Sequence, residues 1–283
     1  MSPSLVAPEA GLTRLTDLLR HGGPMAVITG AGLSTASGIP AYRDQHGQWQ
    51  HSRPIQHQEF LRSETVQRRY WARSFVGWPT IGRAEPNAGH HALARLERAG
   101  RVHTVITQNV DGLHQRAGSQ RVIELHGRIG QVVCLSCRQT YPRHEVQDWL
   151  TRINPDVDPA MAAMARTAPD GDAHLEDAAH AGFRVPACPA CRGPLKPDVV
   201  FFGDNVPRDR VAEATRVMDD ASALLVVGST LMVYSGFRFA SQAHRLGKPI
   251  IAINRGVTRA DDLLTAKIDD DCSTVLTRLL DAL

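Results

Sequence analysis

Residues 25–44, MAVITGAGLSTASGIPAYRD, carry the strongest indication of the fold of this chain. It begins with a short apolar run from Met25 to Thr29, which predicts a buried strand, and a glycine-rich turn follows at Gly30. Such a turn lets backbone N–H groups approach a pyrophosphate at the N-terminus of a helix. Thr35 stands where the dehydrogenase fingerprint has its third glycine, so ordinary hydride-transfer enzymes are disfavoured. Taken alone, the loop is also compatible with a plain tight turn.

Further apolar runs alternate with helical patterns along the rest of the chain. Continuous β-branched runs between helices indicate a parallel sheet covered on both faces. We therefore expect an α/β fold with a Rossmann-like, doubly wound parallel sheet. The expected strands are residues 25–29, 102–107, 122–125, 224–227 and 249–253, and the expected helices are residues 10–20, 88–98, 208–219, 236–246 and 273–283.

Two stretches interrupt this alternation. Residues 45–79 are rich in Gln, His, Arg and Trp and look helical without strands, whereas residues 134–196 contain two cysteine pairs. We therefore predict a smaller inserted domain, made of a helical module at 45–79 and a zinc-binding module at 134–196. The Rossmann-like domain is then discontinuous and comprises residues 1–44, 80–133 and 197–283.

The composition is that of an ordinary globular protein. The chain has 283 residues, 42% of them hydrophobic and 22% charged, and its mean hydropathy is −0.23. No apolar run approaches the roughly 20 residues that span a bilayer, so we expect no membrane association. The net charge of +3 is too small to indicate a nucleic-acid-binding face. The first residues lack a secretion-signal pattern, so we expect a cytoplasmic protein, and we expect it to be monomeric.

Four of the five cysteines form two Cys-x-x-Cys pairs. In a reducing compartment such pairs are typical metal ligands rather than disulfides. Four thiolates complete a tetrahedral zinc site and leave no position for water. We therefore predict one structural Zn²⁺ ion, with chance clustering of four buried cysteines as the weaker alternative. The expected ligands are Cys134, Cys137, Cys188 and Cys191.

Polar motifs follow two of the expected strands. TQNVDGLH, residues 107–114, comes at the end of one strand, and its amides can hold a ribose or a carboxamide. A turn capped by Asn109 and Asp111 is the competing interpretation. At the end of the next strand lies His126, where a neutral imidazole can take a proton from a sugar hydroxyl. Most of the 13 histidines must be structural or on the surface, so the position of His126 before Gly127 is what favours catalysis.

Two weaker motifs also lie at strand ends. GST at residues 228–230 and NRG at residues 254–256 bring hydroxyl, amide and backbone N–H groups to the same edge of the sheet. These groups can reach an adenosine ribose and its phosphate. Each motif alone is a weak signal, but their common location at strand ends gives them collective weight.

Together these motifs resemble those of the sirtuins, which are NAD-dependent protein-lysine deacylases. The resemblance runs from about residue 10 to the C-terminus. It rests on GAGLSTASGIPAYRD, TQNVDGLH, the His-Gly pair, both cysteine pairs, KPDVVFFGD, GST and NRG, in family order. The stretches RYWARSFVGWP, LKPDVVFFGD and LMVYSG are most similar to the class II, sirtuin-4-like branch.

The resemblance implies that NAD⁺ lies in a cleft between the two domains. The acyl-lysine carbonyl oxygen would attack the ribose, nicotinamide would leave, and His126 would act as base through the ribose hydroxyls, giving free lysine and acyl-ADP-ribose. Asn109, a second catalytic residue, and Asp111 would hold the nicotinamide carboxamide, and Gln108 the ribose. The other implied NAD contacts are Gly30, Ala31, Gly32, Ser34, Tyr42, Arg43, Gly228, Ser229, Thr230, Asn254, Arg255, Gly256 and Cys272.

Acylated lysine side chains of proteins are the implied substrates. The peptide would enter as an added strand between residues 199–203 and 231–236. Tyr70 and Arg73 match a Tyr-x-x-Arg pair that recognises acidic acyl groups in desuccinylase-type relatives, and residues three apart share one helix face. We therefore expect activity on acidic or branched acyl groups beyond acetyl, with a surface ion pair of Arg73 as the alternative. The residues expected to line the substrate channel are Val199, Phe201 and Gly203.

Two other functions compete with this interpretation. A protein ADP-ribosyltransferase would use the same NAD site with a protein nucleophile in place of the acyl oxygen, so only the reaction product separates the two. A zinc-ribbon module that binds nucleic acid predicts clustered arginines and exposed aromatic residues around the cysteines. Arg138, Arg143 and Arg192 are too sparse to support that function.

Overall fold

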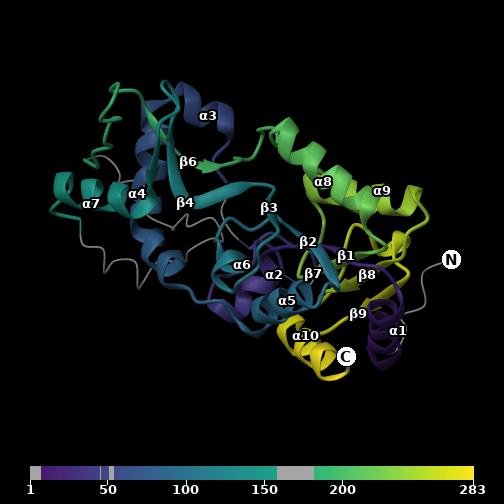
Figure 1. Ribbon diagram of the computed structural model, residues 1–283. Coiled ribbons are helices and arrows are strands. Elements are labelled where there is room, and N and C mark those ends of the chain that lie inside the picture. Colours follow the sequence, from purple (N-terminus) through teal and green to yellow (C-terminus); the bar gives the residue numbers. More distant parts are fainter. Residues whose placement is uncertain (1–7, 45, 51–53, 158–181) are drawn as a thin grey trace.

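The computed structural model describes residues 8–44, 46–50, 54–157 and 182–283. Its larger part is a parallel sheet with helices on both faces (Figure 1). The strands lie in the spatial order β3-β2-β1-β7-β8-β9, so the chain builds outward from β1 on one side and then on the other. This is the strand order of Rossmann-like folds. The strands are β1 (Met25–Thr29), β2 (Val102–Thr107), β3 (Val122–Glu124), β7 (Leu224–Val227), β8 (Ile250–Ile253) and β9 (Ala266–Ile268).

Alternate residues of β1 face opposite sides of the sheet, because side chains alternate along a strand. Met25 and Val27 pack into the cluster formed with one set of helices, and Ala26 and Ile28 pack into the cluster formed with the other. Both faces are therefore buried, as the continuous apolar strands predicted. The helices are α1 (Pro8–His21), α5 (Ala88–Arg98) and α10 (Cys272–Asp281) on one face, and α8 (Arg208–Asp220) and α9 (Tyr234–Arg245) on the other (Figure 1).

The predicted fold class is confirmed, and all five expected strands of the large sheet are present. The sixth strand, β9, was not predicted. It is only three residues long and pairs with β8 at the edge of the sheet, so it lacks the long apolar run by which a buried strand is recognised. None of the described helices is long and apolar enough to cross a membrane.

A smaller unit lies at the other end of the molecule (Figure 1). Its antiparallel sheet, which the sequence did not predict, has the order β5-β4-β6. Of the residues predicted to form the helical and zinc modules, 45, 51–53 and 158–181 lie outside the described residues. The elements are β4 (Gly127–Cys134), β5 (Thr140–Pro142), β6 (Leu195–Val199), α3 (His57–Arg62), α4 (Glu64–Arg83) and α7 (Arg143–Ile153).

Helix α4 continues through Pro79, where the missing N–H leaves the carbonyl of Phe75 without its helical partner. Gln147 on α7 replaces that partner, because its Nε2 donates to the Phe75 carbonyl at 3.0 Å. Arg143, also on α7, donates to the Ser74 carbonyl at 3.1 Å. Helix α7 therefore supplies hydrogen-bond donors to backbone carbonyls of α4, and α4 continues beyond the proline.

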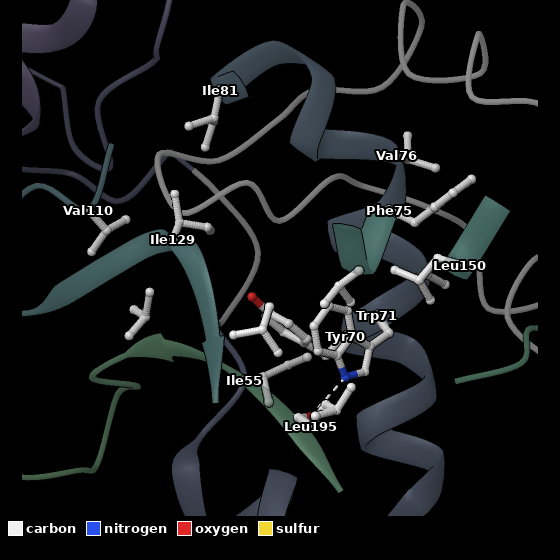
Figure 2. Packing of buried hydrophobic residues seen from close by; sticks show 14 of the residues in the cluster. Ile55, Tyr70, Trp71, Phe75, Val76, Ile81, Val110, Ile129, Leu150 and Leu195 are labelled. Carbon is white, nitrogen blue, oxygen red and sulfur yellow. Dashed lines mark hydrogen bonds between the residues drawn. The ribbon is translucent and has the colours of Figure 1, made fainter. Parts of the chain in front are cut away.

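The core of the smaller unit joins α4 to the antiparallel sheet. Figure 2 shows Trp71 of α4 against Leu195 of β6, with its indole N–H directed at the Leu195 carbonyl. The two atoms lie 3.1 Å apart, and the Trp71 side chain is fully buried. Buried Tyr70 precedes Trp71 and packs edge-on against it. This packing fixes the position of α4 beside the site described next.

Candidate functional site

A cleft of about 660 Å³ lies beyond the carboxyl ends of β1, β2, β7 and β8. This is the edge at which doubly wound sheets bind their ligands, and the volume is typical of a ligand site. Gly256 and Arg73 are the only predicted site residues, apart from the cysteine ligands, that do not line it. Those that do are Gly30, Ala31, Gly32, Ser34, Tyr42, Arg43, Tyr70, Gln108, Asn109, Asp111, His126, Val199, Phe201, Gly203, Gly228, Ser229, Thr230, Asn254, Arg255 and Cys272.

The floor of the cleft is a close contact between the loops that follow β1 and β7. The N–H of Gly32, in the short helix α2 (Ala31–Ser34), donates to the carbonyl of Gly228 at 2.9 Å. Gly228 has a φ of +59°, and a Cβ there would lie 2.3 Å from the amide nitrogen of Leu33. Only glycine allows both this conformation and this approach. The contact leaves the glycine loop open toward the cleft, as binding of a pyrophosphate requires.

Side-chain amides from the loop after β2 join the neighbouring loops. The Nε2 of Gln108 donates to the Ser229 hydroxyl at 2.7 Å. The Nδ2 of Asn109 donates to the carbonyl of Gly30 and to the hydroxyl of Ser34, both at 3.0 Å. The loops after β1, β2 and β7 are therefore held together by polar side chains that also line the cleft.

Asp111 completes this polar network. Its carboxylate accepts hydrogen bonds from the Ser34 hydroxyl at 2.7 Å and from the Leu113 N–H at 2.9 Å. Burial raises the pKa of Asp111, and the two hydrogen bonds oppose that rise. A partly desolvated carboxyl of this kind is suited to accept a hydrogen bond from the amide of a ligand.

His126 lies at the entrance to β4 with both ring nitrogens paired. Nδ1 is 3.0 Å from the carbonyl of Gln108, and Nε2 is 2.8 Å from the hydroxyl of Ser235. A carbonyl can only accept, so the geometry assigns the proton to Nδ1 and leaves Nε2 to accept from Ser235. Burial, with a smaller contribution from the charge of Arg210 and opposed by the hydrogen bond to the Gln108 carbonyl, lowers the pKa of His126 to about 4. The imidazole is therefore neutral at physiological pH and able to act as a base.

Ser235 was not predicted as a site residue, although it belongs to the LMVYSG stretch. A serine in the first turn of a helix carries no signal of its own. The neighbouring Gly236 is more informative, because a Cβ there would lie 2.5 Å from the Oε1 of Gln108. A glycine near the start of a helix after the GST motif can thus indicate where another motif approaches closely.

An aromatic residue that the sequence did not single out supports Tyr42 and Arg43. The ring of Trp49 stacks on Tyr42 with centroids 5.3 Å apart, and the Arg43 guanidinium lies 4.9 Å from the Trp49 ring centroid. Arg43 also donates to the carbonyl of Gly47 at 2.8 Å. These contacts hold a cation at the wall of the cleft, beside the glycine loop.

A buried histidine pair lies behind the glycine loop. His114, the last residue of TQNVDGLH, has its Nε2 2.9 Å from the hydroxyl of Thr29, and its ring centroid is 5.0 Å from that of His90. Burial lowers the pKa of His114 to about 3 and that of His90 to about 4. Both rings are therefore neutral, and His114 is a structural part of the motif that does not line the cleft.

The other wall of the cleft is aromatic. The ring of Phe201, beyond the end of β6, packs 5.1 Å from Tyr70 and 5.2 Å from Phe60. Lys196 lies behind Phe201, with its Nζ 4.3 Å from the ring centroid, and burial lowers its pKa to about 8. Arg73, one helical turn beyond Tyr70, is only 7% exposed. The structure therefore brings Tyr70 and Phe201 together and places Arg73 deeper in α4.

The four predicted zinc ligands come together at one end of the small sheet. Their sulfur atoms all lie within 4.8 Å of one another. Cys134 and Cys191 have their Sγ atoms 3.5 Å apart, and those of Cys137 and Cys188 are 3.7 Å apart. Tetrahedral zinc with Zn–S bonds of about 2.3 Å places sulfurs roughly 3.8 Å apart, so these two pairs are close to the spacing that the ion requires.

Each of the two cysteine pairs lies in the same kind of backbone turn. The N–H of Arg138 donates to the Cys134 carbonyl, and the N–H of Arg192 donates to the Cys188 carbonyl. Both arginines have a positive φ, 63° and 65°. Two equivalent turns that face each other are the arrangement expected of a closed, structural zinc site.

The sheet order, the glycine contact and the polar loop network together define a dinucleotide-binding protein of the Rossmann type. The model of the Sir2 family matches residues 30–235. The chain therefore belongs to the Sir2 family, as its motifs predicted.

Similar proteins agree with this assignment. NAD-dependent protein deacetylase 2 of Bradyrhizobium diazoefficiens is 54% identical over 266 residues, which cover 94% of this chain and 96% of the relative. An NAD-dependent protein deacetylase of Xanthomonas campestris pv. campestris is 56% identical over 250 residues, covering 88% and 84%. A solved Sir2 complex with a p53 peptide and NAD⁺ has a TM-score of 0.76 and 31% identity, covering 95% of this chain and 97% of that chain.

Proposed function

We propose that the protein is an NAD-dependent protein-lysine deacetylase that moves the acyl group from lysine to ADP-ribose and releases nicotinamide. The observation that carries the proposal is the neutral His126, whose unprotonated Nε2 lies in the cleft among the amides of Gln108 and Asn109. The relatives of similar length are named for this activity.

The cleft fits NAD⁺ on its own chemistry. The contact at Gly228 has no side chain, so backbone groups line the cleft where a pyrophosphate would bind. Ser229 and Asn254 place polar side chains at the ends of β7 and β8. Asp111 offers an acceptor that matches the N–H end of a carboxamide, and Asn109 holds the loops around that position, because its Nδ2 donates to Gly30 and Ser34. When bound, NAD⁺ supplies an electrophilic ribose carbon and nicotinamide as the leaving group.

His126 moves the proton in this scheme. Its Nε2 takes a proton from a ribose hydroxyl once the Ser235 hydroxyl turns away, because both compete for the same lone pair. The Nδ1–H bond to the Gln108 carbonyl keeps the ring oriented and stabilises the imidazolium that forms. Burial opposes that charge, so the proton is passed on readily.

For the acyl group, we propose a preference for acidic or branched chains, together with membership of the sirtuin-4-like branch. Tyr70 lines the cleft beside Phe201, and Arg73 follows it by one turn of α4. A carboxylate that enters between the rings would approach the turn that carries this guanidinium.

The test mixes purified protein with NAD⁺ and acetyl-, succinyl-, glutaryl- or hydroxymethylglutaryl-lysine peptides, and identifies the products by mass spectrometry. Acyl-ADP-ribose and nicotinamide are the expected products. Nicotinamide release with ADP-ribose attached to protein and the acyl groups intact would replace the proposal with ADP-ribosyl transfer. In the Arg73→Ala variant, activity on succinyl-lysine should fall at least tenfold more than activity on acetyl-lysine. Equal losses would assign Arg73 a structural role.

A further inference from the structure

Helix α9 carries an arginine in the cleft that the proposed reaction does not use. Arg238 lies one turn beyond Ser235 and lines the cleft with it. Its Nε is buried, and no hydrogen-bond partner for it exists among the described residues. An unpaired buried donor is costly in a folded protein, so such a group usually has a partner that binds in function.

The acidic groups that flank this end of the cleft already have other partners. Asp198 lies 3.9 Å from Arg210, and Asp204 lies 3.4 Å from His57. No ion pair of Arg238 with a carboxylate occurs among the described residues. The positive charge of Arg238 is therefore not paired with a carboxylate of the described residues, although the side chain lines the cleft.

Aromatic contacts hold this guanidinium in place. It lies 5.1 Å from the ring centroid of Tyr234, and Arg259 lies 5.9 Å from the same ring. Arg259 is itself tied to the Met232 carbonyl at 3.1 Å. Tyr234 is 59% exposed, so the cluster of Tyr234, Arg238 and Arg259 reaches the protein surface. A cation held in this way loses little side-chain freedom when it binds a carboxylate.

The position of Arg238 relative to His126 suggests which carboxylate it meets. Three residues of helix separate it from Ser235, a rise of about 4.5 Å along α9. An extended peptide advances about 3.3 Å per residue. A side chain one or two positions from the acyl-lysine therefore passes beside Arg238 when the lysine points at His126.

We propose that Arg238 binds the carboxylate of an aspartate or glutamate that flanks the acyl-lysine, so that the protein selects acidic acylation sites. The inference rests on the proposed deacetylase function and on entry of the peptide beside α9. A planar guanidinium binds a carboxylate through two parallel hydrogen bonds, and this geometry distinguishes glutamate from the isosteric glutamine.

The test compares acetyl-lysine peptides that carry glutamate or glutamine at each of the two positions on either side of the lysine. Initial rates of nicotinamide release give kcat/KM for each peptide at saturating NAD⁺. The expected result is a preference of about tenfold for glutamate at one position or more, which decreases with added salt. Arg238→Gln should remove the preference, and Arg238→Lys should retain part of it. Arg245→Gln, which removes an exposed charge from the same helix, should behave as wild type.

Each alternative result of this experiment would refute a different part of the proposal. Equal turnover of glutamate and glutamine peptides by the wild type would refute the selection of acidic sites while leaving the deacetylase intact. A raised KM for NAD⁺ in Arg238→Gln, with equal losses on both peptides, would assign Arg238 to the cofactor. A loss confined to succinyl-lysine in a neutral peptide would assign it to the acyl group. Absence of nicotinamide release with every peptide would instead refute the proposed function.

Discussion

The buried pair of His90 and His114 predicts that acid destabilises this protein in a defined pH range. Both imidazoles are neutral in the folded state, because burial lowers their pKa values from 6.5 to about 4 and about 3. In the unfolded chain each takes up a proton as the pH falls through 6.5. The unfolded state then binds more protons than the folded state, so stability is lost as the pH falls below 6.5.

The size of the effect follows from these pKa values. At pH 5 an unfolded imidazole is almost fully protonated, whereas the folded His90 is protonated in roughly a tenth of the molecules. This difference lowers the free energy of unfolding by about 2 kcal/mol for each histidine between pH 8 and pH 5. The pair therefore contributes about 4 kcal/mol, a large share of the 5–15 kcal/mol that is typical of a folded domain.

The assay is urea unfolding of the wild type and of His114→Gln at pH 8 and pH 5. The variant keeps an amide that can bond to the Thr29 hydroxyl, but it has one fewer group to protonate. We expect its loss of stability between the two pH values to be about 2 kcal/mol smaller than that of the wild type. Replacement of the exposed His21 by Gln is the matched control and should leave the loss unchanged. An identical pH dependence in wild type and His114→Gln would refute the reasoning.

Three further predictions concern the zinc cluster, the base and the glycine contact. Cys188→Ser should lose bound zinc, measured by metal analysis, and most soluble protein, because closed zinc sites contribute folding energy; a stable, metal-free, active variant would contradict this. His126→Ala should lower kcat by at least a hundredfold with an unchanged circular dichroism spectrum. Because the pKa of His126 is about 4 and the neutral ring is the active form, kcat/KM of the wild type should stay constant from pH 8 to pH 6. A decrease of kcat/KM with a midpoint near pH 6.5 would refute the assignment of His126 as a neutral base. Gly228→Ala should destabilise the fold by more than about 2 kcal/mol and weaken NAD⁺ binding, whereas Gly130→Ala, where a Cβ has room, should do neither.

The sheet and its cleft could be predicted because their signals are local. Strands such as Met25–Thr29 are continuous apolar runs, and parallel strands bring their carboxyl ends to one edge. Any polar motif directly after such a strand must then face the same cleft. Gln108 and Ser229 are far apart in sequence, yet their side chains are hydrogen-bonded for this reason.

Contacts between segments with no local signal could not be predicted. Ser235 at the start of α9 is hydrogen-bonded to His126 in the segment between β3 and β4, and neither residue has a local sequence signal for this contact. Pro79 is a helix breaker by its chemistry, yet α4 continues because Gln147 supplies the missing donor. In both cases a tertiary hydrogen bond overrides or adds to what the local sequence indicates.

The two walls of the cleft have separate structural origins. The cofactor wall is made by loops after strands of the parallel sheet, where the contact at Gly228 tolerates no side chain. The wall that we propose to contact the acyl group is made by Tyr70 on α4 and Phe201 beyond β6, which pack on each other and on Phe60. Aromatic side chains in such a wall can be exchanged at limited cost only for side chains of similar volume. The sequence therefore indicates the cofactor through its rigid motifs, whereas the proposed acyl preference rests on how the rings of the smaller unit pack.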